Sequence, residues 1–165
     1  MSNVTEIRTH QMLTAVTFTI GGVRLAAPAS DLREILEPLP TTRVPGAGDF
    51  ASSVLNVRGA VLPLANLHIP LGITPTDPTV LKAEAQRILV LEVLIEGEPA
   101  TVAINADIVH EVATIPVSAI DKLPATSGWP PEFVRGLFRH TDETFVLLPN
   151  LSAIFTAMAQ RAAVA

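Results

Sequence analysis

The alternation of apolar and polar residues near the N-terminus constrains the fold of this chain most. Residues 16–20 (Val-Thr-Phe-Thr-Ile) alternate with the period of a half-buried strand, and residues 23–25 alternate again after Gly21-Gly22. Two alternating segments joined by two glycines predict a β-hairpin. Three prolines between residues 38 and 45 keep the following segment extended and prevent a long helix. The chain is therefore expected to be mostly β.

The same order of elements recurs in the second half of the chain. Residues 88–95 predict a buried strand, which turns at 96–98 and returns at 100–104. Residues 134–139 and 144–148 read as another hairpin. A hairpin, a short acidic element, a loop, an Arg-Gly pair and an apolar strand thus occur twice. This order predicts a pseudo-repeat of two small barrels, an arrangement that leaves few free strand edges.

The C-terminal tail carries the clearest helical pattern. From residue 151 onward, apolar side chains recur at spacings of three and four, which places them on one helical face. Asn150 or Ser152 could cap the start of this helix. The segment between residues 30 and 36 is less decisive, because a short helical turn and an irregular strand both fit it.

Composition narrows the possible functions. A length of 165 residues suits one domain, or two small halves that share a core. Charged residues make up 16% of the chain, against roughly 25% in a typical soluble protein. The mean hydropathy of +0.43 favours burial of part of the surface against partners, although a large core with a neutral surface also fits. The net charge of −5 argues against nucleic-acid binding, and the absence of cysteine excludes disulfides and thiolate sites.

Neither a signal peptide nor a membrane span is expected. Residues 1–11 are polar and carry charges of both signs, unlike a signal peptide. Two long uncharged runs, at 59–76 and 144–160, are interrupted by prolines and asparagines and do not meet the requirement of about 20 predominantly apolar residues. The chain is therefore predicted to be cytoplasmic.

Catalytic and metal-binding patterns are weak in this sequence. The four histidines lie far apart without the short spacings that metal ligands need, so no metal site is expected. No nucleophile motif occurs, although His110-Glu111 could support acid–base chemistry. The residues alone favour a non-enzymatic interaction module without a cofactor. Two alternatives stay open: a ligand-binding or hydrolytic β-barrel that uses His110 and Glu111, and a self-assembling structural module.

The run from Leu55 to Leu67 contains one arginine, Arg58, between apolar residues and directly before Gly59. The guanidinium carries a fixed charge and a planar fork of donors, which favours bidentate or interfacial contacts. The glycine leaves the backbone free to turn and lets a partner approach closely. A loop arginine that reaches toward water is the competing interpretation.

Taken together, these pieces resemble the CheW family of bacterial chemotaxis coupling proteins. The resemblance runs from about residue 16 to residue 155, nearly the whole chain, and depends on the order and spacing of several short motifs. They are the Phe18–Gly21 hairpin, Leu32–Ile35 (like V-x-E-I), Asn56–Gly59 (like N-L-R-G), Val61–Pro63 (like V-x-P), Asp107–Val109 (like D-x-V) and Val134–Leu137.

The resemblance implies two intertwined five-stranded SH3-like barrels with a C-terminal helix. It implies a single domain at 14–160, with subdomain one at about 23–88, subdomain two at about 89–150 plus the N-terminal strand, and the helix at 151–163. It further implies no catalysis and no cofactor. Such an adaptor would join the regulatory domain of a CheA-type histidine kinase to the tip of a chemoreceptor's cytoplasmic hairpin. It would reach the membrane only through receptor arrays.

The family motifs also imply a receptor-binding site. Arg58 and Gly59 would lie at a receptor-facing groove, with Val54 and Val57 around them and Glu34 as a second contact. The chain departs from the family pattern at Val57 (usually leucine), at Asn66 (usually the aspartate of P-x-x-D-L), and at Ala103 and Asn105-Ala106. These departures indicate a divergent paralogue, for which pilus-based motility or another chemosensory pathway is an alternative.

Overall fold

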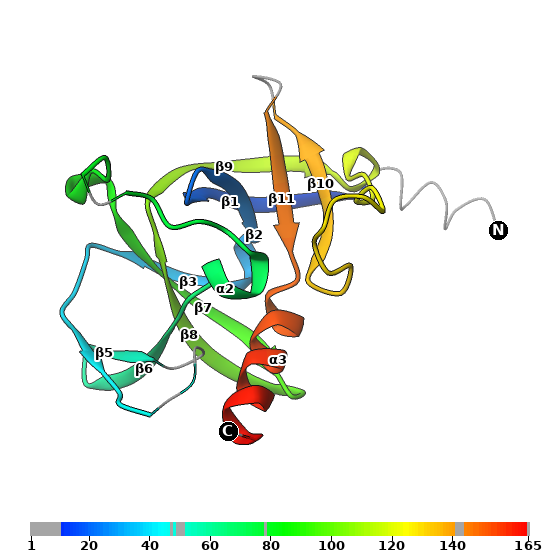
Figure 1. Ribbon diagram of the computed structural model, residues 1–165. Coiled ribbons are helices and arrows are strands. Elements are labelled where there is room, and N and C mark those ends of the chain that lie inside the picture. Colours follow the sequence, from blue (N-terminus) through cyan, green and yellow to red (C-terminus); the bar gives the residue numbers. More distant parts are fainter. Residues whose placement is uncertain (1–10, 47, 49–51, 78, 141–143, 165) are drawn as a thin grey trace.

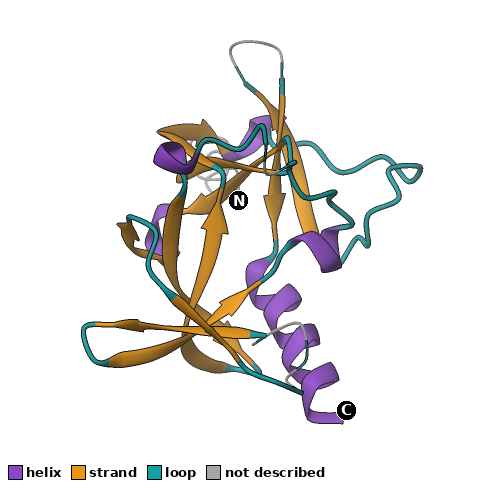
Figure 2. Ribbon diagram, turned by 60° about the vertical axis from the view of Figure 1, so that its left-hand side comes forward, coloured by secondary structure: helices purple, strands orange, loops and turns teal. Residues whose placement is uncertain are grey.

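Two β-sheets and one long helix form the fold in the computed structural model, which describes residues 11–46, 48, 52–77, 79–140 and 144–164 (Figures 1 and 2). Sheet A has the strand order β10-β11-β2-β1-β9, and sheet B has the order β3-β7-β8-β6-β5-β4. The strands of sheet A are β1 (Met12–Ile20), β2 (Val23–Pro28), β9 (Ile108–Pro116), β10 (Val134–Arg139) and β11 (Phe145–Pro149). Those of sheet B are β3 (Leu32–Leu36), β4 (Thr41–Arg43), β5 (Ser53–Val57), β6 (Ala60–Ala65), β7 (Arg87–Ile95) and β8 (Glu98–Ala106).

Helical elements connect and flank the sheets. Helix α3 (Leu151–Val164) follows β11 directly and lies against β7, while the four-residue helix α2 (His68–Leu71) follows β6 (Figure 1). Three short 3-10 turns complete the described elements: η1 (Ala29–Asp31), η3 (Ala83–Ala85) and η4 (Val117–Ala119). Among the described residues, no helix has both the length and the apolar character needed to cross a membrane.

The two halves of the chain exchange strands. Sheet A combines the first hairpin, β1–β2, with β9, β10 and β11, whereas sheet B combines the later hairpin, β7–β8, with β3, β5 and β6. Each sheet contains one parallel contact at the corresponding place, β11 beside β2 and β6 beside β8. The predicted pseudo-repeat and the intertwined, mostly β fold are therefore confirmed. Sheet B carries β4 as a sixth strand, paired with β5 at the outer edge.

Sheet membership changes along the chain near residues 30 and 107. Residues 32–106 supply sheet B, and residues 12–28 with 108–149 supply sheet A. These points differ from the limits of about 23–88 and 89–150 taken from the sequence, and the subdomain limits stay a prediction.

One large core cluster joins the two sheets to the C-terminal helix. It includes Phe18 and Leu25 from sheet A, Leu91 and Ile104 from sheet B, and Phe155 from α3, all almost fully buried. The apolar face predicted for the tail is the face that packs here. Asn150 caps this helix, because its Oδ1 accepts a hydrogen bond from the Ala153 N–H at 3.2 Å. Sheet A, sheet B and α3 therefore share one hydrophobic core.

The β1–β2 turn at Gly21-Gly22 is held from outside by Asp107. The carboxylate Oδ2 of Asp107 accepts hydrogen bonds from the Gly21 N–H at 2.9 Å and from the Thr76 hydroxyl at 2.6 Å. Gly21 adopts a positive φ of 55°, and a Cβ added there would lie 2.3 Å from the Thr74 carbonyl oxygen. Glycine is therefore required at residue 21 for two reasons, the positive φ of the turn and the close approach of the Thr74 backbone.

The segment 30–36 combines the two alternatives that the sequence left open, because the short helical turn η1 leads into β3, an irregular strand with a register shift between Leu32 and Glu34. The two Arg-Gly pairs also differ: Gly59 lies in a turn, whereas Gly136 lies inside β10. A Cβ on Gly136 would lie 2.5 Å from the Asp121 carbonyl oxygen, so a close backbone approach explains this glycine.

Candidate interaction site

Arg58 and Gly59 form the two-residue turn between β5 and β6. Their φ angles are 49° and 87°, and positive values at both central residues are typical of a type I′ hairpin turn. The Gly59 N–H donates to Asn56 Oδ1 at 2.8 Å, which closes the turn. A positive φ is uncommon for a residue other than glycine, asparagine or aspartate. Arg58 therefore lies at a tight hairpin tip, where its side chain is 72% exposed, rather than within a strand.

Glu34 reaches the same hairpin tip from β3, at the far edge of sheet B. Its Oε1 pairs with Arg58 Nη2, so the fold brings together the two charged residues of the expected site. The hydrogen bond to Glu34, reinforced by the carboxylate charge, raises the pKa of Arg58 above its ordinary value. Exposed ion pairs contribute little to stability. The pairing therefore serves to orient the guanidinium more than to hold the fold.

A second ion pair, missed at the sequence level, lies beside the first. Arg33 is the extra residue of the β3 bulge, and its guanidinium pairs with Glu92 of β7. Consecutive residues of opposite charge on β3 thus each meet an opposite charge elsewhere in the fold, Arg33 on β7 and Glu34 at the β5–β6 turn. The adjacent letters Arg33-Glu34 were the only signal in the sequence, and the bulge itself depends on pairing with β7.

The two valines of the expected site have different surroundings. Val57 is buried and packs with Leu55 and Leu62 in a core cluster of sheet B. Val54 is half-buried and lies opposite Pro63 in the β5–β6 register. Strand alternation explains the difference, since Leu55 and Val57 share the inward face.

Exposed apolar side chains flank the charged pair. Val61, on the same hairpin as Arg58, is 67% exposed, and Ile35, next to Glu34, is 42% exposed. Isolated exposed apolar residues are normal, but these two adjoin a paired arginine at one end of sheet B. The sequence motif around residue 58 contained Val61 without indicating its exposure.

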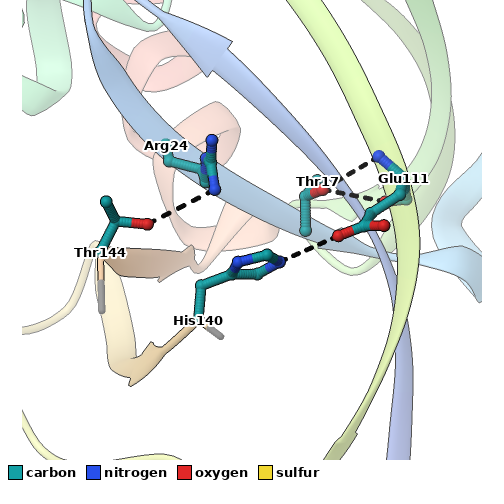
Figure 3. Close-up of polar contacts among 5 residues, drawn as sticks. All are labelled: Thr17, Arg24, Glu111, His140 and Thr144. Atoms are coloured by element: carbon teal, nitrogen blue, oxygen red, sulfur yellow. Dashed lines mark hydrogen bonds and ion pairs between the residues drawn. The ribbon is translucent and has the colours of Figure 1, made fainter. Parts of the chain in front are cut away.

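His110 and Glu111 do not form an acid–base pair with each other. His110 Nε2 lies 2.6 Å from the Thr19 hydroxyl. The Glu111 carboxylate instead pairs with His140 Nε2 at 2.9 Å (Figure 3). Neither the hollow lined by Ile20, Leu64 and Asn66 nor the one beside α3 has His110 or Glu111 among its described lining residues. Across the residues that the structure describes, no group of three potential ligands could hold a metal ion.

Asn66, which departs from the family pattern, organises the short helix α2. Its Oδ1 accepts the His68 N–H at 2.9 Å and lies 2.6 Å from His68 Nδ1. Burial lowers the pKa of His68, and the charge of Asp107 opposes this shift only in part. The amide thus keeps the acceptor contact to the helix start without adding a charge.

Comparisons by family model, by sequence and by structure all match this chain to CheW-like proteins. A model of the CheW-like domain matches residues 14–159. The chain is 28% identical to a probable chemotaxis protein CheW of Rhizobium etli over 90% of each chain, and 27% identical to the protein PilI of Pseudomonas aeruginosa over 87% of this chain and 76% of that one. A crystal structure of the scaffolding protein TtCheW from Thermoanaerobacter tengcongensis matches with a TM-score of 0.71 and 23% identity over 86% of each chain. This last likeness shows a shared fold.

Proposed function

Because the chain belongs to the CheW-like domain family, matched over residues 14–159, we propose that it is a non-enzymatic adaptor in bacterial chemosensory signalling. It couples chemoreceptors to a CheA-type histidine kinase. The observation that carries this proposal is the family match over nearly the whole chain, which includes relatives described as chemotaxis proteins CheW.

The receptor contact is proposed at Arg58, Gly59 and Glu34, with Val54 and Val57 supporting the hairpin. A helical hairpin tip offers an apolar face with polar and charged side chains, and an exposed, oriented guanidinium beside apolar groups suits such a face. Val54 adds half-buried apolar surface, and Val57 anchors β5 in the core. Apart from Gly59 and its two chain neighbours, no described residue has an atom within 4 Å of a Cβ built on Gly59, so the partner's backbone has room at the turn.

The kinase contact is proposed on apolar strand surface of sheet B, to the regulatory domain of the kinase. The sparsely charged composition supports such burial against partners. In this arrangement the adaptor is cytoplasmic and reaches the membrane only through receptor arrays, without nucleic-acid binding or membrane insertion of its own.

A second candidate is the same coupling role in a different pathway, such as pilus-based motility. The chain is 27% identical to PilI, the same identity as to the chemotaxis protein CheW of Helicobacter pylori. Binding assays with receptors from each pathway separate the two candidates.

The test measures binding of the full chain to a kinase regulatory domain and to a receptor cytoplasmic fragment. Arg58→Ala is expected to weaken receptor binding by at least about tenfold while kinase binding is retained, and Glu34→Gln to weaken it less. Arg161→Ala, an exposed arginine on α3, is the matched control and is expected to bind both partners normally. Receptor binding by Arg58→Ala at the wild-type affinity would refute the site. If the wild-type chain binds neither partner at tens of micromolar, the coupling function itself is wrong.

A further inference from the structure

A hollow of about 210 Å³ lies where the two sheets meet. Ile20 at the end of β1 provides a wall from sheet A, and Leu64 of β6 provides one from sheet B. None of the residues proposed for receptor contact lines it.

Several polar side chains line this hollow, and some of their hydrogen-bonding groups have no partner among the described residues. The lining includes the hydroxyls of Ser52 and Ser53, the amides of Asn66 and Asn105, and the imidazole of His68. In the part of the chain that the structure describes, both hydroxyls, the Asn105 amide, the Asn66 NH₂ group and His68 Nε2 have no hydrogen-bond partner. No described polar side-chain atom is both fully buried and unsatisfied, so solvent or a ligand reaches these groups.

The described lining carries no charged side chain. Because burial lowers the pKa of His68, its imidazole is neutral near neutral pH. The described lining residues offer no opposite charge to compensate an ion for the hydration it loses on entry, whereas a neutral ligand needs no such compensation. Concave sites with apolar walls and a few convergent polar groups are typical of small-molecule binding.

We propose that this hollow binds a small uncharged molecule that both donates and accepts hydrogen bonds, of the size of a simple amide or polyol. The Asn66 NH₂ group donates to the ligand, the serine hydroxyls do either, and Ile20 and Leu64 cover its apolar part. The site uses none of the residues proposed for receptor binding.

The test compares acetamide with acetate, which have nearly the same shape and differ in charge. We expect acetamide to shift the backbone amide NMR signals of residues 52, 53, 66–68 and 105 in the full ¹⁵N-labelled chain, with saturation in the millimolar range typical of so small a ligand. Glycerol should shift the same signals. Acetate should bind at least about tenfold more weakly.

Variants place the binding at the hollow. Asn66→Asp keeps the acceptor that contacts His68 but removes the donors and adds a charge, so we expect a several-fold loss of acetamide affinity. Asn56→Asp makes the same change on β5, outside the hollow, and should bind normally. Ser53→Ala, which removes a hydroxyl without a partner, should weaken binding in a chain that stays folded. Equal binding of acetate, shifts that do not saturate or spread over the surface, or unchanged affinity in both Asn66→Asp and Ser53→Ala would overturn the proposal.

Discussion

Thr17 is a polar residue of sheet A that is only 1% exposed, and its replacement by valine should lower the free energy of unfolding. Its hydroxyl donates to the Glu111 carbonyl at 2.9 Å and accepts the Glu111 N–H at 3.2 Å (Figure 3). The β1–β9 register shifts between Val16 and Phe18, at this point. The Thr17 side chain therefore supplies both hydrogen bonds that the interrupted strand ladder leaves unmade.

The magnitude follows from those two bonds. Thr17→Val keeps the shape of the side chain, so no cavity forms. Each hydrogen bond contributes about 0.5–1.5 kcal/mol net, and a stranded buried backbone group costs about 1–3 kcal/mol. Glu111 lies on an exposed edge strand, where water can partly replace the lost partner. We therefore expect a loss of about 2 kcal/mol in the free energy of unfolding.

Urea denaturation measures this loss directly. With a slope of about 2 kcal/mol per molar urea, the Thr17→Val midpoint should fall by about 1 M. Amide hydrogen exchange at Glu111 should accelerate by more than the loss of global stability explains. Thr14→Val, an exposed position on the same strand, is the matched control and should stay within about 0.5 kcal/mol of the wild type. If Thr17→Val is as stable as Thr14→Val, the hydroxyl does not support the bulge and the reasoning is wrong.

Three further predictions concern other parts of the fold. Gly21→Ala should lower the free energy of unfolding by about 2–4 kcal/mol, and Gly22→Ala by only about 1 kcal/mol. Both glycines have a positive φ, but only a Cβ at residue 21 would collide with Thr74. Equal urea midpoints for the two variants would contradict this prediction. Asn150→Ala should lower unfolding free energy by about 1 kcal/mol through loss of the α3 cap; an unchanged midpoint would show that the cap is dispensable. Burial lowers the pKa of His68 below 6.5, so the unfolded chain binds an extra proton and stability should fall as pH drops below that value. His68→Gln should reduce this slope in urea midpoints measured from about pH 7.5 to about pH 5, and an unchanged slope would refute it.

Local patterns were enough to predict the hairpins and the tail helix. The Gly21-Gly22 turn and the apolar face of residues 151–158 both depend on residues close in the sequence, and the structure confirms both. Strand alternation could also have predicted that Val57 is buried, because Leu55 and Val57 share one face of β5. That pattern was not used, and Val57 was expected beside the surface site.

Nonlocal pairing produced the features that the sequence did not reveal. The β3 bulge that presents Arg33 and Glu34 forms against β7, more than fifty residues away along the chain. The pairing of Glu34 with Arg58 depends on how sheet B curves, which no short window encodes. The Arg-Gly pair at Gly136 resembled the first one in letters only, since its glycine is required by a distant backbone segment at Asp121.

The exchange of strands between the two halves has a consequence for synthesis. The β1–β2 hairpin leaves the ribosome first, but β9, β10 and β11 that complete its sheet are among the last strands made. Until they appear, the nascent chain exposes the unpaired edges of this hairpin and its core side chains, a state that favours association with other chains. A chain interrupted after residue 106 would contain every strand of sheet B and only two of sheet A. Sheet A can therefore be completed only after β10 and β11, the last two strands, have been made.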